Sequence, residues 1–327
     1  MPLPILIGAA ILAGSYGVKK GVDAKKDYSR AEDLNSEAKS IYNKAKKKLQ
    51  RERKQAKLAM EQLGKLKFNI YQDQIIPFVD AFIKIKNLEL KSQGLTENKL
   101  SDVNKDQLQE LKSNAYEMKD IVNDGLAALG SGGLAGMAAY GGVGYLGVAS
   151  TGTAISGLSG VAATNATLAW LGGGSLASGG LGMAGGAAVL GGVVAGPVLA
   201  VGGMIMASKA EEAKHNAYAN YDKAELAAEE MKLAGTTTKA IKTRFIEAGE
   251  LLTNLVTNFA PLLDQLQSLI KEETNYSKFT KQQQRDIYKA FQLAVTIKNI
   301  LEAPLLTKKG TPNKNTDRLL KSTKEKL

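Results

Sequence analysis

The residue types that usually carry catalysis or bind metals are scarce in this chain. It has no cysteine and a single histidine, His215, among 327 residues. His215 lies in a run of Ala, Glu and Lys with helical spacing, and a lone histidine there is far more often a surface residue than a ligand or base. Zinc sites of the His/Cys type and Ser–His or Cys–His nucleophilic pairs therefore lack the residues they need. We expect the protein not to be an enzyme and to hold no metal.

Two glycine-rich sequences match the dinucleotide-binding pattern G-x-G-x-x-G, at residues 142–147 and 180–185. That pattern binds a pyrophosphate when it joins a strand to a helix and an acidic residue follows about 20 positions later. Neither match has this context, and such matches arise easily where glycine is so frequent. Asn165 begins a formal glycosylation sequence, but no secretory signal accompanies it. We therefore expect no bound cofactor.

The chemistry that the sequence does offer is electrostatic. The formal net charge is +11, and a dense basic run lies between Lys44 and Lys57. On a helix such a run is most often a solvated face. As a functional site it would attract anionic lipid headgroups, at about 1 kcal/mol per basic residue near the surface. Nucleic acid is a weaker expectation, because stacking aromatic residues and a reading motif are missing nearby. The candidate membrane-surface residues are Lys46, Lys47, Lys48, Arg51, Arg53 and Lys54.

The element that dominates the chain is a stretch without charge, residues 125–208. No Asp, Glu, Lys, Arg or His occurs in it, and it holds 25 of the 34 glycines. Apolar runs longer than about 18 residues are typical of membrane-spanning helices. The stretch therefore predicts a Gly/Ala-rich helical hairpin that is embedded in, or inserts into, a bilayer.

Small residues recur at every fourth position in the second half of this stretch, which places them on one helix face. Such a face lets helices approach closely in lipid. It predicts helix packing in the membrane and a homo-oligomer, through Ala184, Ala188, Gly192, Gly196 and Ala200. Residues 125–149 are a second candidate span, and residues 150–167 a turn between the two.

Two other interpretations of the stretch stay open. A Gly/Ala linker of low complexity would also lack charge. So would a buried soluble core with glycines at helix crossings. Glycine costs about 1 kcal/mol relative to alanine in a helix interior, so a stretch this rich in glycine is a weak helix alone and needs partner helices.

The flanking segments predict an all-α protein. Apolar residues recur there at intervals of three and four over long, charged stretches, and no strand pattern competes. The expected organisation is an apolar N-terminal segment (1–22), a helical arm (23–124), the hairpin (125–208), a second arm (209–304) and a basic flexible tail (305–327).

The spacing also predicts individual helices within the arms. The first arm carries a long polar helix at about 23–66, a more apolar one at 68–90 and a heptad-spaced one at 108–122. In the second arm, Gly235 and the threonines after it break a helix that starts at 209. Thr280 and Gln283 form a capping box for the last helix, which ends before Pro304. A similar order of segments in the two arms, with Pro77 and Pro261 at comparable places, is either a duplication or chance.

Long amphipathic helices on both sides of one apolar hairpin resemble the α-helical pore-forming toxins of the haemolysin E type. The segments that carry this resemblance are 108–122, 125–208 and 217–231, and the Gly/Ala stretch also looks like glycine-zipper membrane segments. The resemblance implies a protein that inserts into and permeabilises or remodels a bilayer as an oligomer. The basic arm favours an anionic bilayer, and the lysines that follow the apolar N-terminal segment would place the arms on the cytoplasmic side. The alternatives are a constitutive membrane scaffold whose arms recruit a cytosolic protein and a soluble nucleic-acid-binding helical protein.

Overall fold

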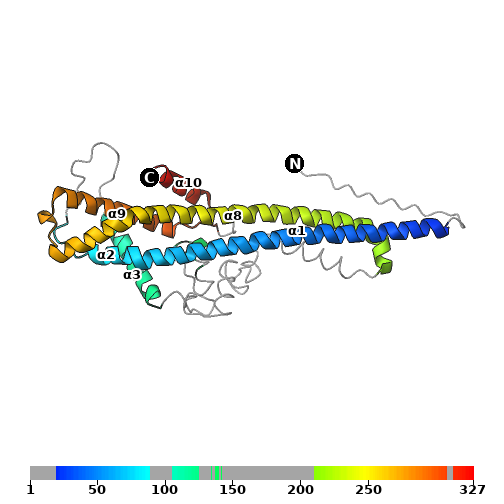
Figure 1. Ribbon diagram of the computed structural model, residues 1–327, viewed down its shortest axis with the longest axis horizontal. Helices are drawn as coiled ribbons and strands as arrows, with labels where there is room; N and C mark the ends of the chain where they lie inside the picture. Colours follow the sequence, from blue (N-terminus) through cyan, green and yellow to red (C-terminus); the bar gives the residue numbers. More distant parts are fainter. Residues whose placement is uncertain are drawn as a thin grey trace. The chain divides into compact units, whose positions relative to one another are not determined.

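The computed structural model describes residues 20–88, 105–124, 134, 137–139, 141, 210–307 and 312–327. Within these residues every regular element is a helix and no strand occurs, which confirms the predicted all-α class. The elements are α1 (Lys20–Ile70), η1 (Tyr71–Ile75), α2 (Ile76–Phe82), α3 (Lys105–Asp124), α8 (Ala210–Glu272), η5 (Tyr276–Lys278), α9 (Lys281–Glu302) and α10 (Lys314–Lys324) (Figure 1).

Helix α8 corrects the expected break at Gly235. It runs without interruption for 63 residues, through Gly235 and Pro261. The hydroxyls of the three threonines after Gly235 donate to the carbonyls four residues earlier, and Thr238 is buried. These bonds satisfy the threonine hydroxyls, and tertiary packing outweighs the low helix propensity of Gly and Thr.

Pro77 changes the helix that precedes it. Proline has no N–H, and its ring crowds the carbonyl four residues earlier, so a regular α-helical turn cannot continue there. The backbone instead widens into the π-helix η1, in which the Ile76 N–H donates to the Tyr71 carbonyl. The predicted helix at 68–90 is thus a continuation of α1 through η1 into α2, ending at Phe82.

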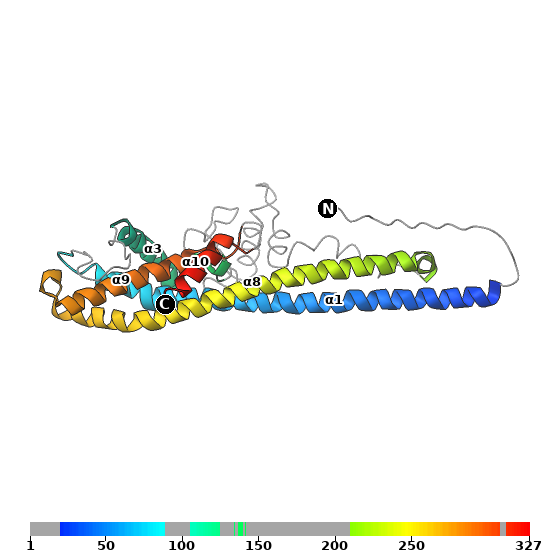
Figure 2. The same ribbon diagram turned by 90° about the horizontal axis from the view of Figure 1, so that it is seen from above.

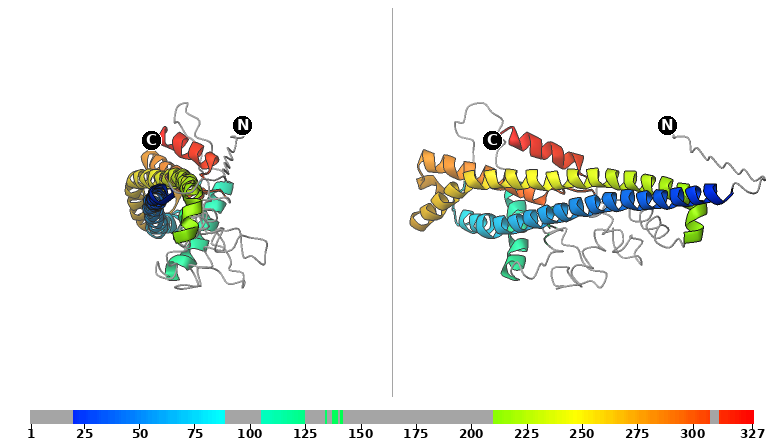
Figure 3. Two further views of the ribbon diagram at one scale, coloured as in Figure 1. Left: turned by 90° about the vertical axis from the view of Figure 1, so that its right-hand side faces the viewer. Right: turned by 45° about the vertical axis from the view of Figure 1, so that its right-hand side comes forward.

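The C-terminal residues also differ from the expectation of a flexible tail. Residues 314–324 form α10, whose Leu320 is buried. The Asp317 carboxylate forms an ion pair with the Arg244 guanidinium at 2.8 Å. The Thr316 hydroxyl donates a hydrogen bond to the Pro304 carbonyl at 2.6 Å. Helix α10 therefore packs along α8, as the right-hand view of Figure 3 shows.

The chain divides into two compact units, residues 1–46 with 196–230 and residues 47–195 with 231–327. In the first unit, the N-terminal part of α1 lies beside the N-terminal part of α8. Their contact is lined by small and aromatic residues, with Ala38, Tyr42, Ala217 and Ala224 buried. Asn220, also buried, donates to the Asn35 side chain at 3.1 Å. This polar pair favours one register between the helices because any other would leave a buried amide unpaired.

The second unit holds the larger core. Helix α9 returns antiparallel beside the C-terminal part of α8, and α3 crosses the end of α1 against η1 and α2 (Figures 1 and 2). Phenylalanines from three helices meet at its centre: Phe78 and Phe82 of α2, Phe259 of α8 and Phe291 of α9. Their ring centroids are 5.2–5.4 Å apart. Pairs at this distance add to the stabilisation that apolar burial already gives.

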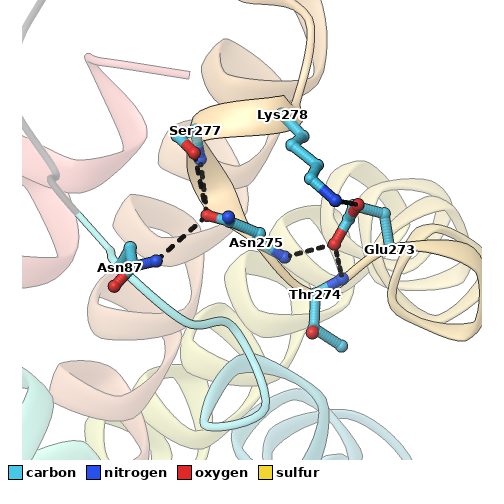
Figure 4. Close-up of polar contacts among 6 residues, drawn as sticks. All are labelled: Asn87, Glu273, Thr274, Asn275, Ser277 and Lys278. Atoms are coloured by element: carbon cyan, nitrogen blue, oxygen red, sulfur yellow. Dashed lines mark hydrogen bonds and ion pairs between the residues drawn. The ribbon is translucent and has the colours of Figure 1, made fainter.

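The turn between α8 and α9 is built on polar contacts (Figure 4). The Glu273 carboxylate accepts hydrogen bonds from the N–H groups of Thr274 and Asn275 and pairs with Lys278 at 2.9 Å. The Asn275 side chain caps η5 and accepts a hydrogen bond from Asn87, which follows α2. Helix α9 then begins with the predicted capping box of Thr280 and Gln283, which is confirmed.

Candidate functional site: the docking site of the Gly-rich stretch

Five residues near the beginning of the charge-free stretch are packed into the core of the second unit. The described residues in it are Leu134, Met137, Ala138, Ala139 and Gly141, which we call the docked segment. All five are buried, and the first four belong to the same hydrophobic cluster as the central phenylalanines. At these residues the packing matches the buried core with glycines at close crossings, which was one of the open interpretations of the sequence.

Two glycines make this close packing sterically feasible. Gly64 of α1 lies against the Leu134 backbone, and a Cβ at position 64 would overlap the Leu134 carbonyl group. Gly141 has a φ of +90° and lies against the Glu302 backbone, where a Cβ would also collide. Glycine alone combines that φ with so close a backbone approach. The close backbone contacts explain why positions 64 and 141 are glycine, which local sequence patterns do not explain.

Hydrogen bonds fix the docked segment to α1 and to the residues that follow α9. The Lys67 amine of α1 donates to the Met137 carbonyl at 3.1 Å and to the Leu301 carbonyl of α9 at 2.9 Å. The Leu306 N–H, just beyond α9, donates to the Ala139 carbonyl at 3.0 Å. Leu301 lies in the last turn of α9, where carbonyls have no partner within the helix. Lys67 thus caps α9 and anchors the docked segment at the same time.

Lys67 is an unusual residue for such a position, because its side chain is only 1% exposed. Burial lowers the pKa of Lys67 from its ordinary value of 10.5 to about 7, although the nearby Glu302 opposes this. Desolvation disfavours the ammonium form, and a single partly shared carboxylate does not compensate. A large fraction of the Lys67 side chains is therefore uncharged at neutral pH.

A partly buried polar cluster adjoins this lysine. Lys298 of α9 is 3% exposed and pairs with Glu302 at 3.2 Å and with Glu110 of α3 at 2.6 Å. The Asn114 amide of α3 also donates to Glu302. Burial nevertheless raises the pKa of Glu302, so desolvation outweighs these favourable partners. The cluster is a place where proton uptake and packing are coupled.

Tyr71 of η1 completes the cluster, one helical turn after Lys67. Its ring is fully buried, and its hydroxyl has no hydrogen-bond partner among the described residues. Burial and the charges of Glu302 and Glu117 raise the pKa of Tyr71 far above its usual range, so the phenol stays protonated.

The spacing of residues in α1 indicates this site, although neither the composition of the chain nor a known motif does. Leu63 and Ile70 belong to the buried apolar side of α1, and Lys67 takes the position four residues after Leu63. A lysine in a core register, three residues after a mid-helix glycine, indicates a buried amine beside a close backbone crossing.

The predicted basic residues are mostly exposed, as a surface site requires. Lys46, Lys47, Lys48, Arg51 and Lys54 are exposed on α1, whereas Arg53 is half-buried. Burial lowers the pKa of the Arg53 guanidinium, and its Nε has no hydrogen-bond partner within the described residues. Arg53 is thus the member of the set least suited to contact a surface.

Within the second unit, three of these residues share one face of α1. Lys47, Arg51 and Lys54 follow one another at intervals of four and three, and Leu58 continues the series with 47% of its surface exposed. None of the three basic residues forms an ion pair with another described residue. The face therefore offers three cations and one apolar side chain to a partner.

The other predicted residues lie outside the described part of the chain. These are the packing residues Ala184, Ala188, Gly192, Gly196 and Ala200, the G-x-G-x-x-G sequences at 142–147 and 180–185, and Asn165. His215 lies within α8. In the ranges that the structure describes, no group of three or more His, Cys, Asp or Glu side chains could hold a metal ion.

Among the described helices, none combines the length and the apolar content that crossing a bilayer requires. Most of residues 125–208 fall outside that search. Comparisons with protein-family models, curated proteins and solved structures found no match to this chain.

Proposed function

We propose that this is a non-enzymatic, membrane-acting helical protein whose helices hold a charge-free stretch that inserts into a bilayer. One observation carries the proposal: 84 consecutive residues lack any charge, and the described residues near their start are buried against the helical core. Burial keeps these residues away from water as long as the docked segment stays in place. Insertion would expose them to lipid instead.

In the membrane, the stretch would form a helical hairpin that associates with copies of itself. The small residues from Ala184 to Ala200 would line the contact between helices, where close approach replaces the hydrophobic driving force. Association of several hairpins would permeabilise or remodel the bilayer. The helical arms would then remain on the cytoplasmic side, next to anionic headgroups.

The exposed basic face of α1 supports an anionic surface as the partner. Lys47, Arg51 and Lys54 have no competing ion pair among the described residues, so lipid phosphates would not have to displace one. Leu58 on the same face would enter the headgroup region while the basic side chains remain at its surface.

The decisive experiment mixes the purified full-length protein with vesicles that enclose a dye. We expect dye release from vesicles rich in phosphatidylserine and much less from neutral phosphatidylcholine vesicles. A protein that stays in solution, neither floating with vesicles of either kind nor releasing dye, would refute the proposal.

The basic face is tested by Lys47→Gln together with Arg51→Gln and Lys54→Gln. The triple variant should bind anionic vesicles more weakly, and its binding should depend less on salt, because each lost charge contributes about 1 kcal/mol. The matched control replaces three exposed basic residues elsewhere, Lys281, Lys321 and Lys326, and should bind like the parent.

The packing face is tested by Gly192→Leu with Gly196→Leu. Two large side chains would hold the helices apart, so crosslinked oligomers should disappear from vesicles. Oligomers that persist in the variant would argue against this face.

A membrane scaffold that recruits a cytosolic protein is the second candidate. The apolar faces of α8 around Ala217 and Leu252 are buried within the chain's own units, so they are not available to a partner. The observation in favour of a scaffold is instead that α8 exposes Tyr218, Leu226 and Leu233 by 61–70%. A scaffold should bind vesicles without releasing dye, which separates it from the first proposal.

A further inference from the structure

We propose that the docked segment is an autoinhibitory latch that the uncharged amine of Lys67 holds closed and that opens when this amine takes up a proton. The regulatory meaning of the latch rests on the proposed function. Its opening and closing can nevertheless be measured in solution, without any membrane.

The hydrogen bonds of Lys67 match an uncharged amine. A neutral amine has two N–H donors, and both have acceptors here, the carbonyls of Met137 and Leu301. An ammonium group has a third N–H, and no acceptor for it occurs among the described residues. Protonation would thus leave a buried donor unpaired and bury a charge, and each of these costs free energy.

Opening the latch would remove this cost. The docked segment covers Lys67 and supplies one of its two acceptors, so its departure would let water reach the amine. The same departure would uncover Gly64, whose backbone lies against Leu134. The charged form of Lys67 therefore favours the open state and the uncharged form favours the closed one.

The ionisable groups around Lys67 come from three elements. Helix α9 contributes Glu302 and Lys298, helix α3 contributes Glu110 and Glu117, and η1 contributes Tyr71. The docked segment contributes none, because residues 125–208 have no ionisable side chain. Glu302 is the group that favours a charged Lys67, but Lys298 and Asn114 already share its carboxylate.

The sign of the pH dependence follows from the direction of each shift. The pKa of Lys67 is about 7 when docked and returns towards 10.5 when exposed. At pH values between these two pKa values, closing the latch releases a proton from Lys67. Lowering the pH over this range therefore opens the latch. Burial raises the pKa of Glu302, so this group acts in the opposite sense, with closure strengthening as the pH falls through its titration.

The absence of cysteine provides a direct measurement. Ala138→Cys places one thiol at a fully buried position of the docked segment, and Ala219→Cys places one at an exposed position of α8. The labelling rate of Cys at 138 divided by that at 219 reports opening, because the ratio removes the effect of pH on the thiol itself. We expect this ratio to rise on the order of 50-fold from pH 9 to pH 7, the change that pKa values of about 7 and 10.5 imply.

Two variants of the Ala138→Cys protein test the cause. Lys67→Met removes both hydrogen bonds and the titration, so labelling should be fast and independent of pH. Gly64→Ala should also label fast at both pH values, because its methyl group would collide with Leu134. The matched control is Gly235→Ala, whose methyl group would meet no atom within 4 Å and should leave the pH dependence unchanged.

A labelling ratio that is constant from pH 7 to pH 9 in the parent would overturn the latch, as would an unchanged pH dependence in Lys67→Met. The parent measurement alone decides the matter if either variant loses helical content in circular dichroism. Dye release by the same variants separates the two proposals. Fast labelling with no dye release by the parent or by any variant would leave the latch standing and remove the proposed membrane function. Fast labelling with release equal to that of a releasing parent would show that the latch does not inhibit this function.

Discussion

At the scale of single residues, the buried polar groups of α9 carry more weight than the many exposed charges. Lys298 is almost fully buried, and its two carboxylate partners belong to different helices, Glu302 of α9 and Glu110 of α3. A surface ion pair contributes little, since water and salt screen it. A buried pair behaves differently, because removing one partner leaves the other charge without compensation.

We predict that Lys298→Ala lowers the free energy of unfolding by about 3 kcal/mol, since it leaves the half-buried Glu302 carboxylate without its ion-pair partner. The measurement is urea denaturation followed by circular dichroism. Lys281→Ala, at an exposed position of the same helix, is the control and should change stability by less than about 0.5 kcal/mol. Equal stabilities of the two variants would contradict this account of the cluster.

Glu273 gives a second prediction at this scale. The side chain of Lys278 and the Asn275 N–H lower the pKa of Glu273 from 4.5 to about 2. Its contribution to stability is therefore complete above pH 4.5 and disappears as the pH falls towards 2.

Glu273→Gln should accordingly lower the urea midpoint at pH 7 and have a shrinking effect between pH 4.5 and pH 2. The neighbouring Glu272→Gln serves as a control, because Glu272 is exposed, and the hydrogen bonds of the turn are accepted by Glu273 and Asn275 (Figure 4). A difference between Glu273→Gln and its parent that stays constant down to pH 2 would show that the turn does not depend on this carboxylate.

At the scale of elements, the helix that continues from α1 through η1 into α2 responds to a helix-breaking residue differently from α8. Pro77 widens the backbone into η1, whereas Pro261 lies within a continuous α8. Gly235 does not end α8 either, although an isolated glycine followed by threonines is a common helix break. Long helices gain most of their stability from tertiary packing, so a single unfavourable residue shifts the balance only slightly.

Gly235→Ala should therefore stabilise the protein by about 0.5–1 kcal/mol, because alanine is the better helix former and its methyl group meets no neighbour. Thermal unfolding of the two proteins tests this. Gly249→Ala is the companion measurement, since its methyl group would make ordinary contacts with Leu63 and Leu66. A loss of stability in Gly235→Ala would mean that this residue needs a conformation other than the helix.

At the scale of the whole molecule, the two units differ in what holds them together. The first unit joins parts of two helices through small residues and the pair of Asn35 and Asn220. The second unit joins α2, α8 and α9 through the four phenylalanines, and it also contains the docked segment. The second unit is consequently the one whose stability depends on a hydrophobic core.

Phe259→Ala should cost about 4 kcal/mol of unfolding free energy in the second unit, the usual effect of deleting a fully buried aromatic ring. Hydrogen exchange should then lose protection in α9 and in the adjoining part of α8. Leu226→Ala, at a position of α8 that is 61% exposed, is the control and should leave exchange unchanged. Undiminished protection of α9 in Phe259→Ala would contradict the central role of the aromatic cluster.

The amino-acid sequence by itself determined the helical class, most helix positions and the charge-free stretch. These follow from local patterns: apolar residues every three or four positions, a capping box at Thr280 and the composition of residues 125–208. Only the tertiary structure decided that Lys67 is buried, that Gly64 must be glycine and that residues 314–324 form a helix packed along α8. The reason is physical: the acceptors of Lys67 lie 70 and 234 residues away along the chain. Periodicity tells which side of a helix avoids water, but only packing decides which distant carbonyls reach a buried amine.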